Sequence, residues 1–328
     1  MNDFLSLRTL PRDQVQNLVN LARELKANPI NDTLRGKVVG LLFMNPSLRT
    51  LASFQAGIGQ MGGTSVVIQP GTGTWTLETR DGIVMDGPEV EHIREAIPVL
   101  ASYCDILGIR SFANQINLDE DLADHLMHKF ADLSSKPLIN MESASDHPCQ
   151  ALADWQTLDE LDIPADGNFV LSWAWHPKPL PYAVPRAALT MAALRGMNIT
   201  IHSPKSHPLP DELVAEAKAL GAKSIRNTHT ANESLENAHV LYCKSWVAPQ
   251  NYGDPEAEMR LRKNLREWCV AESWFETAWS DAKFMHCLPV RRNVKVADEI
   301  LDGPRSVVIH QAENRLHAQK AILTNLIN

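Results

Sequence analysis

Short apolar segments alternate with segments of helical periodicity along almost the whole chain, and this alternation restricts the fold more than any other feature. The apolar segments that we expect to be strands form two series, at residues 38–43, 65–69, 105–110 and 138–141, and at residues 169–173, 198–202, 223–226, 240–243, 283–286 and 306–309. Helical patterns lie between most of them, for example at residues 89–103, 148–161, 182–195 and 210–220. This order is typical of parallel sheets covered by helices on both faces. The sequence therefore predicts an α/β protein with two domains, each a doubly wound parallel sheet.

The two series of strands place the domain boundary in the helix that follows His147. A chain of 328 residues is long enough for two domains of ordinary size. We expect them at residues 1–150 and 151–310, with a last helix at residues 311–328 packing back on the first domain. Because ligands of open α/β sheets bind beyond the carboxyl ends of the strands, we expect the active site in a cleft between the domains.

Charge and composition exclude several classes of protein. The formal net charge of −8 argues against general nucleic-acid binding, and no apolar run is long enough to span a membrane. The N-terminus lacks the pattern of a signal peptide, and the five cysteines show no paired spacing, so we expect a reduced, cytoplasmic protein. The histidines form no Cys/His cluster, so we expect no metal, and we expect solvated positions for His202, His207, His229 and His239.

The segment Asn45-Pro46-Ser47-Leu48-Arg49-Thr50 lies between a predicted buried strand and a helical pattern. Backbone N–H groups at the start of a helix point outward and favour an anion, and the planar guanidinium of Arg49 suits phosphate oxygens. The segment predicts a phosphate-binding loop. The alternative is an ordinary Ser/Thr helix cap with a solvated arginine.

Other polar residues also follow predicted strands or begin helices. Arg110 ends a buried strand, and His147 precedes Pro148 at a predicted helix start, where a neutral imidazole could donate to a developing oxyanion. Cys287 follows the strand at residues 283–286, but no base other than its neighbour His286 is evident, so covalent catalysis is not favoured. Arg315 is expected near the start of the last helix as a further anion ligand. Each of these residues also has an ordinary structural alternative, as a cap or a solvated side chain.

Together, Ser47-Leu48-Arg49-Thr50, Arg110, His147-Pro148-Cys149-Gln150 and His286-Cys287-Leu288-Pro289 resemble the aspartate/ornithine carbamoyltransferase family in order and spacing, over nearly the whole chain. The resemblance implies an enzyme without a cofactor that transfers the carbamoyl group of carbamoyl phosphate to an amine. It also implies a homotrimer with shared active sites, in which the first domain binds carbamoyl phosphate and the second binds the amine substrate.

Three further sequence features distinguish the branches of that family. Ordinary ornithine carbamoyltransferases carry an Asp-x-x-x-Ser-Met-Gly segment, where this chain reads Tyr242-Cys243-Lys244-Ser245-Trp246, and aspartate carbamoyltransferases lack the cysteine of His-Cys-Leu-Pro. Several segments of this chain resemble the branch that acts on N-acylated ornithine in arginine biosynthesis. They are Trp75, Met85-Asp86-Gly87, Asn140-Met141-Glu142, His176-Pro177-Lys178-Pro179-Leu180 and Arg291-Arg292-Asn293.

The main residue that indicates the acyl group of the substrate is Val90, which precedes Glu91-His92. In the acetyl branch a Glu stands at that place, and in the succinyl branch a Pro. A Glu would repel a succinyl carboxylate, and Val removes that repulsion. Residues 75–79, 95–98, 103–105 and 180–185 are also more succinyl-like, whereas Cys149 and residues 293–295 are acetyl-like. We predict N-succinyl-L-ornithine as the substrate, with N-acetyl-L-ornithine as the alternative.

The resemblance also implies a role for each motif residue. Carbamoyl phosphate is expected on Ser47, Leu48, Arg49, Thr50, Trp75 from a neighbouring subunit, Arg110, His147, Gln150, Cys287, Leu288 and Arg315. The catalytic set is His147, Arg110, Thr50 and Cys287, of which the first three face the carbonyl oxygen, and either Cys287 or the leaving phosphate takes the proton of the attacking δ-amine. The acylornithine is expected on Val90, Glu142, His176, Lys178, Lys244, Arg291 and Lys295, the last of which can be carboxylated in the acetyl branch. Two other classes are alternatives, a non-catalytic anion-binding regulatory subunit and a phosphoryl-transfer enzyme. The second should have metal-binding carboxylates at strand ends, and the sequence shows no convincing set of them.

Overall fold

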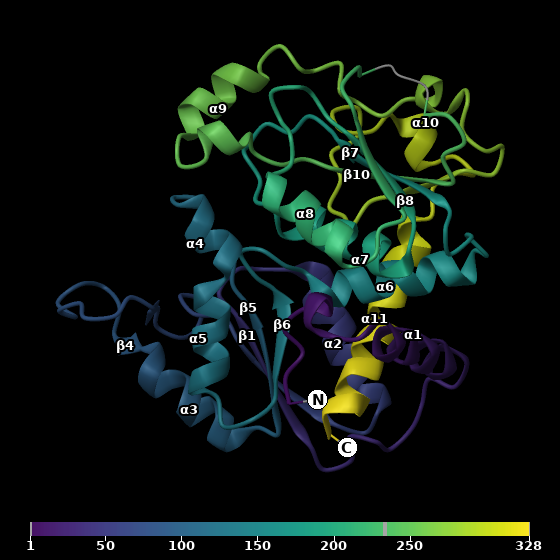
Figure 1. The fold of residues 1–328 in the computed structure, drawn as a ribbon. Coiled ribbons are helices and arrows are strands. Elements are labelled where there is room, and N and C mark those ends of the chain that lie inside the picture. Colours follow the sequence, from purple (N-terminus) through teal and green to yellow (C-terminus); the bar gives the residue numbers. More distant parts are fainter. Residues whose placement is uncertain (1, 232–234, 328) are drawn as a thin grey trace.

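The computed structural model describes residues 2–231 and 235–327, and it contains two parallel sheets with helices packed on both faces (Figure 1). The first sheet has the strand order β2-β1-β5-β6, formed by β1 (Val38–Phe43), β2 (Thr64–Ile68), β5 (Ile106–Arg110) and β6 (Leu138–Glu142). The second has the order β11-β10-β7-β8-β9, formed by β7 (Asn168–Trp173), β8 (Asn198–His202), β9 (Ser224–Thr228), β10 (Val240–Lys244) and β11 (Lys283–Met285). A two-stranded ladder pairs β3 (Leu77–Glu78) with β4 (Glu91–His92). The predicted α/β class with two parallel sheets is confirmed.

The helices connect the strands in the right order for doubly wound sheets. Their bounds are α1 (Arg12–Ala27), α2 (Leu48–Gln60), α3 (Ile93–Tyr103), α4 (Leu118–Ala123), α5 (His125–Leu133), α6 (Pro148–Glu160), α7 (Ala183–Arg195), α8 (Asp211–Ala219), α9 (Pro255–Arg262), α10 (Asp298–Leu301) and α11 (Val308–Ile327). Short 3₁₀ turns lie at Leu7–Thr9, Pro249–Asn251 and Glu272–Phe275. In the part of the chain that the structure describes, no helix is both long enough and apolar enough to cross a membrane.

Strand order fixes where each sheet can bind a ligand. In the first sheet the chain leaves β1 toward β2 on one side and returns to β5 on the other, so the order reverses between β1 and β5. In the second sheet it reverses between β7 and β10. The crevice at such a reversal, outside the carboxyl ends of the strands, is the usual ligand site of open α/β sheets.

Close packing in the first sheet depends on a glycine in its central strand. A Cβ at Gly40 in β1 would lie 2.6 Å from Cδ2 of Leu107 and 2.9 Å from Sγ of Cys104. Any larger residue would force the side chains of Leu107 and Cys104 to move, because such distances are far below van der Waals contact. The pairing of β1 with β5 runs from Val39 opposite Ile106 to Phe43 opposite Arg110, so both strands end at the same edge.

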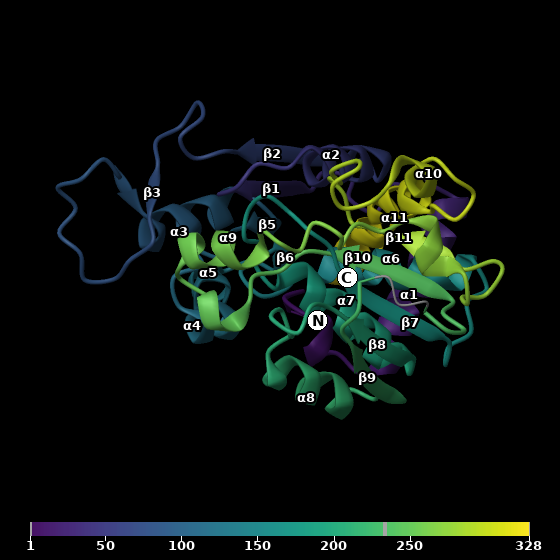
Figure 2. The ribbon, with the colours of Figure 1, turned by 90° about the horizontal axis from the view of Figure 1, so that it is seen from above.

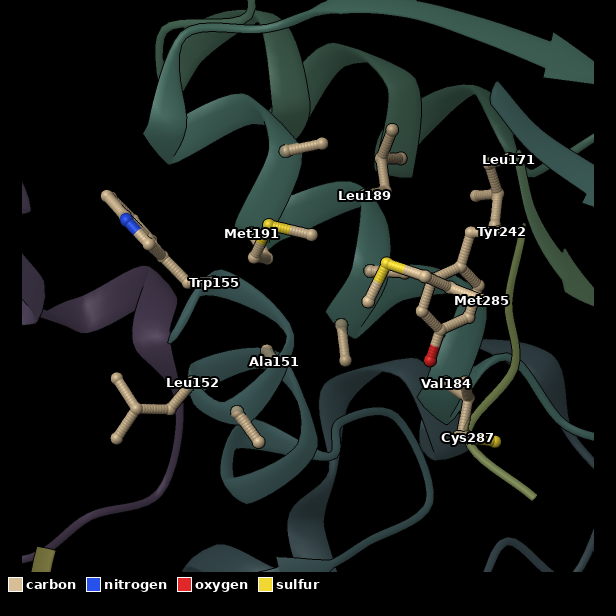
Figure 3. Packing of buried hydrophobic residues seen from close by; sticks show 14 of the residues in the cluster. Ala151, Leu152, Trp155, Leu171, Val184, Leu189, Met191, Tyr242, Met285 and Cys287 are labelled. Carbon is tan, nitrogen blue, oxygen red and sulfur yellow. The ribbon is translucent and has the colours of Figure 1, made fainter. Parts of the chain in front are cut away.

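The helices α6 and α7 form the packed layer between the two sheets. Every residue of α7 is buried, and the helix packs against α6 on one side and the second sheet on the other. Figure 3 shows Leu189 and Met191 of α7 between Trp155 of α6 and Leu171 of β7. A helix that is apolar on all sides is buried in a core. The helix also carries two buried arginines, and each forms an ion pair that offsets the burial of its charge, Arg186 with Glu216 and Arg195 with Asp159.

The last helix, α11, packs against α1, α2 and α6. Lys320 is fully buried there, and its ammonium donates to the backbone carbonyls of Leu25 and Pro29 and to the side chain of Gln60. These contacts join α11 to the ends of α1 and α2. A cation beside the last carbonyls of a helix is favourable to its dipole.

Two predictions about local structure are wrong. Residues 306–309 were expected to form a strand, but Ser306 makes only an isolated bridge to Phe284, and α11 begins at Val308. The β-branched residues there are the first turn of an amphipathic helix, in which Ile309 is 75% exposed.

His202 and His207 were expected to be solvated, but both are fully buried. The ring of His202 lies 4.7 Å from that of Trp268, and His207 lies 4.7 Å from Trp173. The two rings are part of the core of the second sheet. His229 is exposed and His239 is half-buried, as expected for loop positions.

Candidate active site

A cavity of about 290 Å³ lies where the carboxyl ends of the two sheets meet. It is built almost entirely from segments that directly follow strands β1, β5, β6, β7, β10 and β11, together with Arg315 of α11. The lining residues are Pro46, Ser47, Arg49, Thr50, Arg110, Phe112, Glu142, His147, His176, Leu180, Pro181, Ala183, Val184, Lys244, Cys287, Leu288, Pro289, Lys295 and Arg315. The chain thus brings its polar strand-end motifs into one pocket, at the place that both strand orders indicate.

The cavity is strongly cationic. Five of the lining residues are basic, namely Arg49, Arg110, Lys244, Lys295 and Arg315, and Glu142 is the one acidic residue among them. A concave site of this charge concentrates anions and holds them in a region of low dielectric constant. The arrangement suits a ligand, or a pair of ligands, with several negative charges.

The first turn of α2 forms one wall of the cavity. Ser47 is the N-cap of this helix, and its hydroxyl accepts a hydrogen bond of 3.2 Å from the N–H of Thr50. Arg49 lines the cavity, where burial lowers the pKa of its guanidinium and the charge of Arg110 lowers it further. The side chain of Leu48 is 80% exposed and lies outside the lining. Only the backbone of Leu48 can therefore contribute to an anion site here.

Arg315 connects the first turn of α2 with the start of α6. It is buried two turns into α11, deeper than the sequence indicated, and donates 3.2 Å to Oγ1 of Thr50 and 2.9 Å to Oε1 of Gln150. Gln150 is buried behind Arg315 and does not line the cavity, so it acts on the site through that arginine. The guanidinium also lies 3.4 Å from Nε2 of His147.

His147 is held neutral by its surroundings. Burial lowers its pKa well below the usual value, and the charges of Arg315 and Arg110 lower it further. Its Nε2 lies 3.4 Å from Oε2 of Glu142, which also accepts from Arg110. Within residues 2–231 and 235–327, Nδ1 of His147 is buried without a hydrogen-bond partner. A neutral imidazole carries one N–H, so this side chain can donate one hydrogen bond to an oxygen in the cavity without adding a charge.

The second sheet contributes Lys244, Cys287 and Lys295. Nζ of Lys244, at the end of β10, donates 3.3 Å to Sγ of Cys287. Lys295 is 2% exposed, and burial, together with the charge of Lys244, lowers its pKa to about 7. Leu288 has a left-handed backbone with φ of 55°, and its N–H donates 2.8 Å to Nδ1 of His286. The side chains of Lys244, Lys295 and Cys287 present two amino groups and a thiol to the same cavity.

A loop after β7 closes the cavity on this side. His176 lines the cavity, and burial lowers its pKa to about 4, so the ring is neutral. Arg291 is exposed outside the lining, but its Nε lies 3.3 Å from Nε2 of His176. Lys178 is exposed and also lies outside the lining.

Two of the predicted site residues lie away from the cavity of their own chain. Trp75 is 56% exposed and Val90 is 68% exposed, and neither lines the cavity. Both belong to the segment around β3 and β4 that extends from the body of the molecule in Figure 2. Nε1 of Trp75 donates 2.7 Å to Glu91 within that segment.

Several residues that form the site are absent from the set predicted from the sequence. Phe112 lines the cavity and packs on Arg110, whose guanidinium carbon lies 4.4 Å from the ring centre. Its position two residues after Arg110, beyond the end of a predicted buried strand, could have identified it as a candidate site residue. Asp154 is fully buried behind the site and accepts 2.8 Å from Gln150 and 2.7 Å from Gln311. Nothing in the local sequence distinguishes it from a solvated helix residue.

Comparison with known proteins gives the class that this fold and site define. Residues 2–160 match the carbamoyl-P binding domain of aspartate/ornithine carbamoyltransferases, and residues 183–326 match the Asp/Orn binding domain of the same proteins. The chain belongs to the aspartate/ornithine carbamoyltransferase family. The resemblance predicted from the strand-end motifs is confirmed.

Relatives at 36–38% identity are named for N-acylated ornithine substrates, and relatives at 33% identity are named ornithine carbamoyltransferase. The chain is 38% identical over 334 residues to an N-acetylornithine carbamoyltransferase of Xanthomonas campestris pv. campestris, covering 100% of this chain and 98% of the relative. It is 36% identical over 295 residues to an N-succinylornithine carbamoyltransferase of Bacteroides thetaiotaomicron, covering 89% and 88%.

Solved structures agree with this placement. The structure of acetylornithine transcarbamylase complexed with acetylcitrulline superposes with a TM-score of 0.95, at 37% identity and covering 100% of both chains. An N-acetyl-L-ornithine transcarbamylase with one glutamate replaced by valine, complexed with carbamyl phosphate and N-succinyl-L-norvaline, gives a TM-score of 0.94 at 37% identity, covering 99% of this chain and 100% of that one.

Proposed function

We propose that the protein transfers the carbamoyl group of carbamoyl phosphate to the δ-amine of an N-acylated ornithine, giving N-acylcitrulline and phosphate for arginine biosynthesis. The observation that carries this proposal is the cationic cavity in which Arg49, Thr50, Arg110, His147 and Arg315 meet. The comparisons support it because relatives at 36–38% identity, covering 89–100% of this chain, are named N-acetylornithine or N-succinylornithine carbamoyltransferase.

The first domain supplies the groups for carbamoyl phosphate. We place its phosphate at the first turn of α2 with Arg49 and Arg315, because a helix N-terminus and two guanidinium groups favour a doubly charged anion. Its carbonyl oxygen then faces Thr50, Arg110 and neutral His147. These groups stabilise the negative charge that grows on the oxygen as the carbon becomes tetrahedral.

The reaction needs no covalent enzyme intermediate. The δ-nitrogen of ornithine forms a bond to the carbamoyl carbon, and the bond from that carbon to the phosphate oxygen breaks. The amine has an ordinary pKa of about 10, so it must lose a proton, which goes to the leaving phosphate or to Cys287. Much of the acceleration comes from holding two substrates together in the correct orientation.

The second domain supplies the groups for the acylornithine. Lys244 and Lys295 are cations for its carboxylates, Glu142 faces the ornithine part, and His176 joins the exposed Arg291 to the cavity. Lys178 and Arg291 would reach a substrate only at the rim. We accordingly assign residues 1–150 to carbamoyl phosphate, residues 151–310 to the acylornithine, and residues 311–328 to the first domain.

We propose N-succinyl-L-ornithine as the acylornithine. Val90 carries no charge that would repel a succinyl carboxylate, and the cavity has four more basic than acidic residues. A related transcarbamylase has been solved with N-succinyl-L-norvaline after a glutamate was replaced by valine, the residue type at position 90 here. N-acetyl-L-ornithine is the second candidate, because the relatives at 37–38% identity are named for that substrate.

We further propose a homotrimer in which Trp75 and Val90 reach the cavity of a neighbouring subunit. The support is their position, exposed on the extended segment and outside the cavity of their own chain. The five cysteines are free thiols, which supports a reducing, cytoplasmic location.

One experiment tests the substrate. Purified protein with carbamoyl phosphate is offered ornithine, N-acetyl-L-ornithine and N-succinyl-L-ornithine in parallel, and the ureido product is measured. We expect the highest kcat/KM with the succinyl compound, and we expect Val90→Glu to move the preference toward the acetyl compound. A strong preference of the unmodified protein for N-acetyl-L-ornithine contradicts the succinyl proposal, and turnover of neither acyl compound contradicts the function.

A further inference from the structure

A buried ion pair lies behind the loop that closes the cavity after β7. Glu258 and Arg262, one turn apart in α9, are both 0% exposed. Nε of Arg262 donates 2.9 Å to Oε1 of Glu258, which also accepts 3.0 Å from Nε2 of His207. The other oxygen of Glu258 accepts from the N–H of Ala248 at 3.3 Å and from Asn251 at 3.2 Å. None of these residues lines the cavity.

The free side of the Arg262 guanidinium holds the loop through its backbone. Nη1 donates 2.8 Å to the carbonyl of His176 and 2.8 Å to the carbonyl of Lys178. In return, the carbonyl of Arg262 accepts 2.8 Å from Nε1 of Trp175. The Arg262 side chain therefore holds His176 and Lys178, and its backbone carbonyl holds Trp175. His176 faces the cavity from this segment, and Leu180 and Pro181 follow it in the lining.

Stability alone does not explain this arrangement. Removing two charges from water costs several kcal/mol per ion, and replacing a buried ion pair by apolar residues is often neutral or stabilising. An apolar residue at position 262 could not, however, donate to two inward-pointing carbonyls. A lysine would keep the charge but has no planar fork to reach both carbonyls and Glu258 together. The contacts that require an arginine are those to the loop.

We propose that Arg262, oriented by Glu258 and His207, is a positioning residue that shapes the acylornithine half of the site by holding the 175–178 loop. The inference rests on the proposed function, because it assigns the second substrate to this side of the cavity. Carbamoyl phosphate is assigned mainly to the other domain, and in the described part of the chain Ser47, Arg49 and Thr50 share no hydrogen bond with Arg262, Glu258 or His207. Loss of the loop contacts should therefore affect one substrate and spare the other.

The decisive variant is Arg262→Lys, which keeps the buried positive charge beside Glu258. We expect its KM for the acylornithine to rise at least tenfold, with the dissociation constant for carbamoyl phosphate, measured by calorimetry, within twofold of the unmodified protein. Arg260→Lys is the matched control, because Arg260 lies on the same helix with its side chain 70% exposed. That control should change neither value.

Two further measurements keep the test decisive. Thermal unfolding shows whether Arg262→Lys folds; if it does not, His207→Gln, which removes the ring but leaves both charges, is measured in its place. Amide hydrogen exchange of residues 174–182 should be faster in the variant that folds. An unchanged KM with unchanged exchange overturns the proposal, and an equal loss of affinity for both substrates assigns Arg262 a general structural role and also overturns it.

Failure of the proposed function gives a different result. If the unmodified protein carbamoylates no acylornithine, the exchange measurement still decides whether Arg262 holds the loop, because it needs no substrate. Faster exchange with normal binding of carbamoyl phosphate then supports the positioning role while the acylornithine assignment is withdrawn.

Discussion

Arg315 of the last helix donates a hydrogen bond of 3.2 Å to Oγ1 of Thr50, although 265 positions of sequence separate the two residues. The same guanidinium donates to Gln150, which in turn donates to Asp154. Gln311, also on α11, donates to the same oxygen of Asp154, Oδ1. The last helix therefore contributes to the cationic cavity, and its contacts join the first turn of α2 to the start of α6.

Replacing Arg315 by alanine should weaken carbamoyl phosphate binding. The variant loses a buried cation at the proposed phosphate position, and a hydrogen bond to a charged group contributes about 1.5–3 kcal/mol, or about 10- to 150-fold in affinity. Calorimetry with carbamoyl phosphate measures the change. Arg23→Ala, an exposed arginine on α1, is the control, and equal affinity of the Arg315 variant and that control would contradict the assignment.

Replacing His147 by alanine should mainly lower kcat. The residue is neutral and buried, so its proposed contribution is one hydrogen bond to the oxyanion, and loss of such a donor typically costs roughly 10²- to 10³-fold in rate. Steady-state kinetics at saturating substrates measure this loss. Because burial and nearby cations hold its pKa well below 6.5, titration of His147 should add no fall in activity between pH 8 and 6. A turnover number that stays within a few-fold of the original would remove His147 from the mechanism.

Buried neutral histidines should make the protein less stable in mild acid. Burial lowers the pKa of His147 and His286 well below the ordinary value and that of His202 to about 4. Below about pH 6.5 the unfolded chain takes up protons at these positions while the folded chain does not, so unfolding is favoured as pH falls. Each group contributes up to about 1.4 kcal/mol per pH unit between the two pKa values.

Urea unfolding at pH 7 and pH 5 measures this effect. The free energy of unfolding should be at least about 2 kcal/mol lower at pH 5. His202→Asn supplies the matched comparison, because it removes one titrating ring far from the cationic cavity, and its stability should vary less steeply with pH. An identical slope in both proteins would show that His202 does not contribute.

The parts of the molecule that sequence analysis located best are those determined by local pattern. The apolar strands, the capped start of α2 and the polar strand ends all depend on residues that are close together in the chain, and parallel strand topology then brings those ends together. Arg262, Glu258 and Asp154 could not be found in this way. Charged residues are rarely buried without partners. An i, i+4 pair such as Glu258 and Arg262 is also common on exposed helices, and the partners that bury these residues, His207, the loop carbonyls and Gln311, come from other elements. The positions of Trp75 and Val90 relative to a cavity depend on the assembly of subunits, which no single chain specifies by pattern alone.

Lys295 lies in the cavity, and the protonation state of its amino group changes near neutral pH. Burial, and then the charge of Lys244, lowers its pKa to about 7, whereas His176 beside it has a pKa of about 4 and stays neutral across this range. Below pH 7 the ammonium form predominates, and above pH 7 the neutral amine predominates. If Lys295 pairs with a carboxylate of the acylornithine, substrate affinity should fall as pH rises.

The unreactive analogue N-succinyl-L-norvaline allows this prediction to be measured as binding alone, since it has no δ-amine to titrate. With carbamoyl phosphate present, its affinity should fall about tenfold between pH 6 and pH 8, because the charged fraction of a group with a pKa near 7 falls by about that factor. Lys295→Arg keeps a positive charge throughout the range and should bind with little pH dependence. Any residual slope in that variant belongs to other groups, such as the bound phosphate. Equal slopes in the two proteins would place the titrating group elsewhere and leave Lys295 without a part in carboxylate binding.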